Sequence, residues 1–273
     1  MKLNTERIVS NSSTKHASFI NSLNPYESVH PLAEANIYLM DQNELSARFS
    51  LESAMRLLDA EEKSTCNQIR SSERVKEFAY ARAFTKSVLS KYTNISIGDV
   101  CLVPRDRFGK LKIKSLQSPL FFNLSHSAGL IALCVCKVTE VGVDLEKQDE
   151  SMLPHIKKIA NRSFSSAESK IINSLSEVEI CEQFYRMWTL KEAMLKAAGI
   201  GLNCSIKNID TTQVDDSRCL CIDSGNQNGK FYSHYWFGIK PNYHLSVASI
   251  DVPVTFQLAK SSSFIEQLAK HGV

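Results

Sequence analysis

The chain has 273 residues, of which 43% are hydrophobic and 22% are charged, and its formal net charge is +3. This composition is typical of a folded globular protein with a sizeable core, and it excludes a chain that is disordered over most of its length. The small charge excess does not predict a nucleic-acid partner, and no apolar run approaches the roughly 18 residues of a membrane-spanning helix.

The eight cysteines include no Cys-x-x-Cys pair and no histidine spacing typical of a zinc site. The first thirty residues are polar and lack the apolar stretch of a secretion signal, so we expect a cytoplasmic protein with its thiols buried and reduced. Residues 1–30, rich in Ser, Asn and Thr, are expected to form a loose N-terminal extension.

The first half of the chain, residues 31–140, predicts a mixture of strands and helices. Hydrophobic periodicity favours strands near 35–40, 121–127 and 130–135, and helices near 45–58 and 73–91. Asp59 is expected to cap a further helix that begins at about residue 60.

The second half, residues 141–255, repeats this order with a strand at 141–146, a capping motif at Ser165 and a helix over 184–198. Three residue pairs lie 106 positions apart in the two halves: Glu62 and Glu168, Phe78 and Phe184, Leu89 and Leu195. The repeat predicts an α+β fold of two similar halves related by internal duplication and a pseudo-twofold axis, with the active site at their interface. Residues 256–273 are expected to form a peripheral C-terminal tail.

Acidic and basic residues recur at spacings that predict a shared site. Asp144 and Glu146 alternate with apolar residues on the strand, so they leave it on one side, and Glu192 and Lys196 lie one helical turn apart. Three carboxylates in one cleft repel one another unless a cation neutralises them, and Mg²⁺ prefers carboxylate oxygens. The same patterns also fit a solvated strand face and a surface ion pair.

The duplication indicates that this constellation occurs once. Lys86 and Ser90 stand 106 positions before Glu192 and Lys196, so the first half lacks the acidic member of the pair. Lys191 falls within the apolar stripe of its helix, where an ammonium group needs a partner or a path to solvent.

Two further groups are candidates for binding a phosphate. Ser125 and His126 are adjacent on a strand and therefore point to opposite faces, which disfavours a nucleophile and base and favours hydrogen-bond donors or a structural histidine. Arg105, Gly109 and Lys110 lie in a basic turn that is either solvated or able to bring its backbone close to a phosphate.

Residues 141–146 (VGVDLE) together with 188–196 (WTLKEAMLK) resemble the paired signature of the 4′-phosphopantetheinyl transferase superfamily, in its Sfp-type, pseudo-dimeric single-chain group. The likeness covers roughly residues 55–250 and includes 123–127 (NLSHS). It implies transfer of the phosphopantetheine arm of coenzyme A to a serine of an apo acyl carrier or peptidyl carrier protein, with release of adenosine 3′,5′-bisphosphate.

The resemblance also implies a role for each matching residue. Asp144, Glu146 and Glu192 match Mg²⁺ ligands, Glu192 also matches the base, and Lys196 matches a pyrophosphate contact. The residues implied to bind coenzyme A are Arg105, Gly109, Lys110, Ser125, His126, Asp144 and Lys196. The chain departs from the family pattern at Leu111, where proline is common, and at Thr65, where a basic residue is common and for which Lys63 is a possible substitute.

We expect a monomer with no nucleic-acid or membrane partner. Two other functions fit the residues: a non-catalytic module that binds a carrier protein or nucleotide on the same scaffold, and another Mg²⁺-dependent phosphotransferase. No G-x-x-x-x-G-K-[ST] loop is present to support the second. The carrier that is modified, and the choice between Mg²⁺ and Mn²⁺, stay open at the level of sequence.

Overall fold

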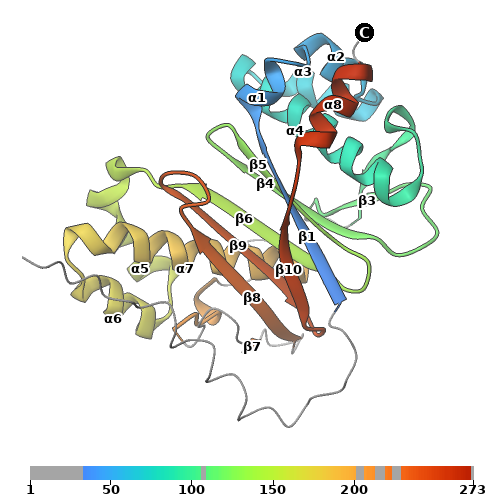
Figure 1. Ribbon diagram of the computed structural model, residues 1–273. Coiled ribbons are helices and arrows are strands. Elements are labelled where there is room, and N and C mark those ends of the chain that lie inside the picture. Colours follow the sequence, from blue (N-terminus) through green and yellow to red (C-terminus); the bar gives the residue numbers. More distant parts are fainter. Residues whose placement is uncertain (1–32, 106–108, 201–205, 213–218, 223–228, 272–273) are drawn as a thin grey trace, which may run out of the picture. The chain divides into compact units, whose positions relative to one another are not determined.

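Two four-stranded sheets and a small hairpin organise the computed structural model (Figure 1), which describes residues 33–105, 109–200, 206–212, 219–222 and 229–271. The expected extension at residues 1–30 lies outside these residues. The strands are β1 (Ala33–Asp41), β2 (Leu102–Pro104), β3 (Leu111–Ile113), β4 (Phe121–Ser127), β5 (Leu130–Cys136), β6 (Val141–Lys147), β7 (Cys219–Ile222), β8 (Gly229–Phe237), β9 (Tyr243–Ile250) and β10 (Val254–Ala259). The helices are α1 (Gln42–Ser46), α2 (Leu51–Arg56), α3 (Ala60–Gln68), α4 (Ser72–Thr93), α5 (Leu153–Ser163), α6 (Ser166–Ser174), α7 (Glu177–Ala198) and α8 (Ser262–His271), with 3₁₀ turns at Ile97–Asp99, Glu150–Met152 and Ile206–Asn208.

Three strands of each large sheet share one connectivity. The first has the order β10-β1-β5-β4, and the second has the order β6-β9-β8-β7. In each, the opening strand pairs antiparallel with the second strand of a later hairpin, β1 with β5 and β6 with β9. The fold is therefore α+β, as the sequence predicts.

The two sheets pack against each other and carry helices on their outer faces. Along β5, Leu130, Ala132, Cys134 and Cys136 join the second sheet in one core, and Ile131, Leu133 and Val135 join α4 in another. This burial on both faces is why the strand has no polar alternation. α1 to α4 and α8 gather on the first sheet, and α5 to α7 gather beside β6, β8 and β9 (Figure 1).

The predicted helices form with small shifts in their bounds. α4 extends the helix predicted at 73–91 by one or two residues at each end, and α7 begins seven residues before the predicted start at 184. The predicted helix at 45–58 is interrupted, because Ser50 caps a new helix, α2, with its side chain. Asp59 and Ser165 each form the expected cap, in both cases a full capping box with the glutamate three residues on.

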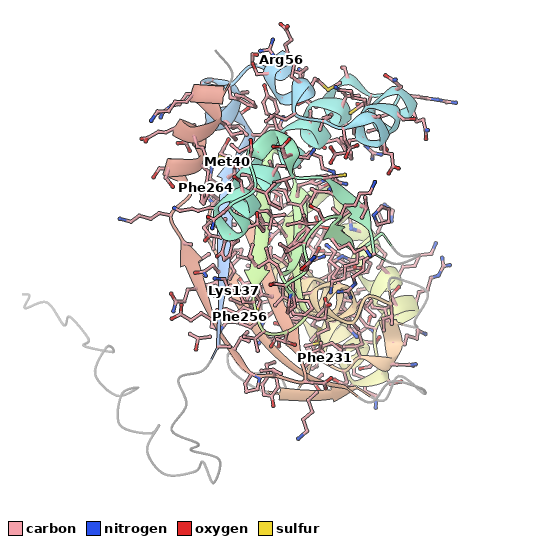
Figure 2. The ribbon with its side chains drawn as sticks, turned by 90° about the vertical axis from the view of Figure 1, so that its right-hand side faces the viewer. Met40, Arg56, Lys137, Phe231, Phe256 and Phe264 are labelled. Atoms are coloured by element: carbon pink, nitrogen blue, oxygen red, sulfur yellow. The ribbon has the colours of Figure 1, made fainter. Side chains whose placement is uncertain are left out.

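The C-terminal segment is not peripheral, contrary to expectation. β10 extends the first sheet by pairing in parallel with β1, from Ala33 opposite Val254 to Tyr38 opposite Ala259. Phe264, Ile265 and Leu268 of α8 are buried in the first core, and Phe264 lies near Met40 in Figure 2. Apolar residues at helical spacing explain this docking, since α8 presents one apolar face to the sheet and to α4.

A buried ion pair of the same kind occurs in each part of the chain. Glu62 pairs with Lys86 at 2.7 Å, and Glu168 pairs with Lys191 at 2.6 Å, each glutamate coming from its capping box. The two lysines lie 105 positions apart (191 − 86), one fewer than the offset of 106 between the two glutamates. The ends of α4 and α7 show the same shift, because Asn94 and Gly199 are both left-handed C-caps.

Two other properties bear on expectations from the sequence. Within the described residues, no helix combines the length and the hydropathy that crossing a membrane would require. The cysteines whose side chains are described, Cys66, Cys101, Cys134, Cys136 and Cys181, are free thiols, and all but Cys101 are buried.

Replacing Leu268 by alanine tests whether α8 is part of the core. Leu268 is 0% exposed, so Leu268→Ala is expected to lower the free energy of unfolding by about 2–5 kcal/mol, the usual cost of a large-to-small change in a core. Guanidinium denaturation measures the change, and Glu266→Ala on the exposed side of the same helix is the matched control. Equal midpoints for the two variants would show that α8 is only loosely attached.

Candidate active site

A hollow of about 360 Å³ lies where β4, β6 and α7 meet. Its lining residues are Leu124, Ser125, His126, Asp144, Glu146, Trp188, Glu192 and Lys196. All four residues singled out by the acidic motif and the Glu-x-x-x-Lys pair are among them, together with Ser125 and His126. The structure thus brings together six predicted site residues from three elements that are far apart in the sequence.

Lys196 and Asp144 form the central contact of this hollow. Lys196 Nζ lies 2.7 Å from Asp144 Oδ1 and donates to Ser125 Oγ at 3.1 Å, and Ser125 Oγ donates to the same Asp144 oxygen at 3.2 Å. Asp144 is 4% exposed, and the Lys196 side chain is 29% exposed, so the ammonium group bridges a buried carboxylate and the open hollow. The exposed surface-pair interpretation of this lysine is therefore wrong.

The close approach of α7 to β6 depends on Gly142. A Cβ atom at Gly142 would lie 2.0 Å from the Ala193 carbonyl oxygen and 2.4 Å from the Ala197 nitrogen, both backbone atoms of α7. Only glycine fits at this crossing. Because Asp144 follows two residues later on the same side of β6, this contact places it within reach of Lys196.

Burial and like charges perturb the acids of the hollow. Burial, followed by the charge of Asp144, raises the pKa of Glu146 to about 7. The same two causes, in the same order, raise the pKa of Glu192. Partial removal from water lowers the pKa of His126, which favours the neutral imidazole. Carboxylates with raised pKa values can accept a proton near neutral pH, as general bases do.

The residues present suit a hard divalent cation, although the side chains do not form a metal-binding cluster as they stand. Among the described residues, no three His, Cys, Asp or Glu side chains are grouped so as to hold a metal ion. Asp144 Oδ2 is nevertheless buried without a hydrogen-bond partner. An unsatisfied carboxylate oxygen beside two acids with raised pKa values is a donor set that a cation such as Mg²⁺ would stabilise.

Lys191, which the sequence left unexplained, serves the architecture. Its ammonium group is 0% exposed, pairs with Glu168 and donates to the Ile206 and Ile209 carbonyls. Glu168 also accepts hydrogen bonds from the Thr211 amide at 2.9 Å and hydroxyl at 2.6 Å. The lysine therefore joins α6, α7 and the segment 206–211 and does not line the hollow.

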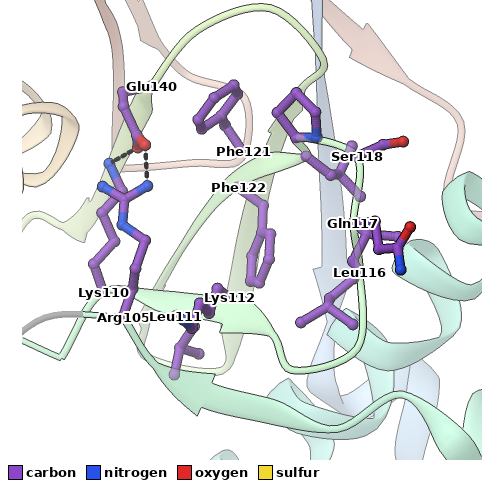
Figure 3. Close-up of a pocket in the computed structure, with 13 residues that line it drawn as sticks. Arg105, Lys110, Leu111, Lys112, Leu116, Gln117, Ser118, Phe121, Phe122 and Glu140 are labelled. Carbon is purple, nitrogen blue, oxygen red and sulfur yellow. Dashed lines mark hydrogen bonds and ion pairs between the residues drawn. The ribbon is translucent and has the colours of Figure 1, made fainter.

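The basic turn lies apart from this hollow. Arg105 and Lys110 both pair with Glu140 and line a separate hollow of about 240 Å³ whose wall includes Leu116 and Phe122 (Figure 3). Lys110 is 7% exposed. Gly109 adopts φ = +83°, the left-handed conformation expected of glycine in such a turn. The structure does not bring these three residues to the acids.

A larger hollow of about 790 Å³ reveals two residues that the sequence did not single out. Arg70, which lies just before α4, and Arg74, in its first turn, line it together with Glu77 and His126. His126 lines both this hollow and the acidic one, so the two share a wall. Neither Lys63 nor Thr65 lines it. A helix N-terminus beside two arginines favours anion binding. The sequence did not connect these arginines with the site, because His126 lies beside them only in the folded structure.

An α+β fold with a carboxylate-rich hollow between a strand motif and a helix motif can be compared with known proteins. Residues 140–248 match the profile of the 4′-phosphopantetheinyl transferase superfamily. This match includes β6 and α7, whose motifs resemble those of the superfamily.

Curated relatives agree with this assignment. The 4′-phosphopantetheinyl transferase HetI of Nostoc sp. is 34% identical over 148 residues, which cover 53% of this chain and 61% of HetI. The L-aminoadipate-semialdehyde dehydrogenase-phosphopantetheinyl transferase of Mus musculus is 26% identical, over 62% of this chain and 60% of the relative. The 4′-phosphopantetheinyl transferase Sfp of Bacillus subtilis is 24% identical over 72% of this chain and 84% of Sfp. The chain thus spans about three fifths of the first two relatives and most of the third.

Gly142→Ala tests whether the close crossing holds α7 in place. The added methyl group meets backbone atoms that cannot turn aside, so the helix must shift, and overpacking of this kind costs about 1–3 kcal/mol. Guanidinium denaturation and amide exchange along α7 measure the shift. Gly98→Ala is the matched control, because a Cβ there has no neighbour within 4 Å. Similar stability for both variants would contradict a tight crossing.

The raised pKa of Glu146 predicts a pH-dependent stability in buffer with no divalent cation. The pKa of Glu146 is about 7 in the folded protein and 4.5 in the unfolded chain. The folded state therefore holds this proton more tightly. The stability that this provides is complete below pH 4.5 and is lost as the pH rises through 7. Glu146→Gln removes this loss, so the variant should gain stability relative to the wild type between pH 5 and pH 8. Denaturation at several pH values measures the difference, and a difference that is constant with pH would refute the shift.

Proposed function

We propose that this protein transfers the 4′-phosphopantetheine arm of coenzyme A to a serine of an apo acyl carrier or peptidyl carrier protein. The observation that carries the proposal is the convergence of Asp144, Glu146, Glu192 and Lys196 on one hollow. The match of residues 140–248 to the superfamily profile and the names of the relatives support it.

Asp144, Glu146 and Glu192 are the residues that would hold Mg²⁺ in this proposal. When bound, the ion would neutralise the charge of the coenzyme A pyrophosphate and polarise it toward attack. The buried, unpartnered Asp144 Oδ2 and the raised pKa values of both glutamates support this assignment.

Lys196 would contact the pyrophosphate in the proposed complex. Its side chain reaches the hollow, and its Nζ is held by Asp144 and Ser125. The ammonium group is therefore already positioned for a pyrophosphate and needs little reorganisation on binding. Ser125 and His126 of β4 would lie beside the nucleotide phosphates, and His126 would donate to them. Arg105 and Gly109 complete the proposed contacts with the nucleotide end, with Lys110 beside them at the end of α7. Arg70 and Arg74 join them because they share a hollow with His126.

The proposed reaction is an in-line displacement at phosphorus. The carrier serine oxygen forms a bond to the β-phosphorus of coenzyme A, and the bond from that phosphorus to the bridging oxygen breaks. Adenosine 3′,5′-bisphosphate leaves with the electron pair, and the serine proton passes to Glu192, directly or through a water molecule. Burial helps Glu192 in this role, because a raised pKa makes the carboxylate a stronger base.

The proposal extends to the organisation of the chain. We infer that residues 31–140 and 141–255 are duplicated halves, that the site lies at their interface, and that the protein acts as a cytoplasmic monomer. The shared strand connectivity and the two capping-box ion pairs support the duplication. β4 from the first half and β6 with α7 from the second line the same hollow, which supports an interface site.

A transfer assay tests the function directly. Incubation of the full chain with coenzyme A, Mg²⁺ and an apo carrier protein should add the mass of the phosphopantetheine arm to the carrier, as measured by mass spectrometry. Carriers from fatty-acid, polyketide and peptide synthases form the panel. No mass gain on any of them would overturn the proposal.

Glu192→Gln distinguishes the enzyme from a binding module. The amide cannot accept the serine proton and is a weaker cation ligand, so transfer should fall by at least about 100-fold while coenzyme A still binds. Single-turnover transfer and calorimetric binding measure the two effects. Glu182→Gln, on the exposed face of the same helix, is the control and should transfer normally. Undiminished transfer by Glu192→Gln would remove Glu192 from the chemistry.

A further inference from the structure

The junction of the two large sheets is made by side chains. β4 is the last strand of the first sheet and β6 is the first strand of the second, and no backbone ladder joins these two edges in the described residues. Three side chains of β4 accept hydrogen bonds from the β6 backbone instead. Asn123 Oδ1 accepts from the Val143 amide at 2.9 Å, Ser125 Oγ from the Leu145 amide at 3.3 Å, and Ser127 Oγ from the Lys147 amide at 3.2 Å.

Strand geometry explains the regular spacing of these contacts. Residues 123, 125 and 127 lie on one face of β4, because side chains alternate along a strand. In the antiparallel pairing of β6 with β9, alternate β6 residues direct their amides away from β9, and these are the amides of residues 143, 145 and 147. Each side chain therefore meets one exposed edge amide, which would otherwise be left unpaired near the core at considerable cost.

Lys110 adds a fourth contact at the start of β6. Its Nζ donates to the Val141 carbonyl at 3.3 Å and, on α7, to the carbonyls of Lys196 at 3.0 Å and Ala197 at 2.9 Å. The last carbonyls of a helix carry partial negative charge, so the ammonium group is well placed there. Residues 110, 123, 125 and 127 thus follow the β6 edge at every second residue from 141 to 147, and we call them the edge ladder.

The edge ladder also touches the acids of the hollow. Ser127 Oγ donates to Glu146 Oε2 at 3.0 Å while it accepts from the Lys147 amide. Ser125 Oγ donates to Asp144 and accepts from both Leu145 and Lys196, which uses its one donor and both of its acceptor positions. A hydroxyl fixed by the backbone on one side can hold a carboxylate on the other, so the ladder sets the direction of both acidic side chains.

We propose that Lys110, Asn123 and Ser127 are positioning residues of the active site, through which the first half of the chain holds Asp144, Glu146 and the end of α7 in the geometry for transfer. This inference rests on the proposed function for its effect on turnover. The hydrogen bonds of the ladder stand independently of that function and can be measured without it.

Ser127 offers the sharpest kinetic test. Ser127→Ala leaves the Glu146 carboxylate and the Lys147 amide without their shared partner, and loss of such an outer contact commonly costs about 10- to 100-fold in activity. We expect kcat to fall by this factor with the KM for coenzyme A unchanged, and Ser127→Thr, which keeps the hydroxyl, to restore most of it.

Ser249→Ala is the matched control, because Ser249 is a buried serine of the second sheet that donates to the Val252 carbonyl, away from the hollow. If Ser127→Ala loses no more turnover than Ser249→Ala, or if threonine does not rescue it, the positioning role of Ser127 is refuted.

Amide hydrogen exchange provides a readout that does not depend on activity. Ser127→Ala should speed exchange of the Lys147 amide, and Asn123→Ala that of the Val143 amide, each by at least about tenfold, while the amides bonded to β9 keep their protection. Unchanged exchange at both edge amides would refute the ladder even in an active enzyme. If the wild type transfers nothing, the proposed function fails, and the exchange rates still decide whether the ladder exists.

Discussion

The crossing of α7 over β6 at Gly142 is the constraint on which the rest of the site depends. Because the helix backbone lies where a Cβ would be, Lys196 reaches Asp144 at 2.7 Å and Glu192 faces the same hollow. A helix held at the ordinary distance from a sheet would leave these charges apart. The sequence spacing of Glu192 and Lys196 has chemical meaning only because this glycine allows the contact.

A buried ion pair next to the hollow-lining face of α7 also constrains the position of this helix. The Glu168–Lys191 pair is 0% exposed on both sides, and the Glu168 carboxylate is also satisfied by the capping box and by Thr211. A buried pair of this kind gives little net stability, yet breaking it is costly, because one charge is left without a partner. It therefore favours a single arrangement of α7. The Glu62–Lys86 pair likewise favours a single arrangement of α4. Both long helices are therefore constrained by a buried glutamate–lysine pair.

The two long helices share this kind of support, but different side chains lie beside them. α7 and β6 supply the acids and Lys196, and β4 of the first sheet supplies polar side chains that face them. The hollow therefore lies where edge strands of the two large sheets meet. A chain of this kind gains a site at the junction without disturbing either core, since the apolar faces of β5 and β6 pack elsewhere.

The sequence by itself determined the elements, the caps and the group of residues that meets in the hollow, because strand alternation, helical spacing and capping boxes are local properties. It misjudged α8, because the apolar face of that helix is buried only when the sheet and α4 lie against it. It also did not show that Lys86 pairs with Glu62, because that contact depends on how α3 and α4 pack. Only the tertiary structure decided that Lys191 is structural, that Lys110 lies at the end of α7 rather than among the acids, and that Asn123 and Ser127 meet the β6 edge. Those roles depend on which backbone groups remain unpaired after folding, and no local pattern records them.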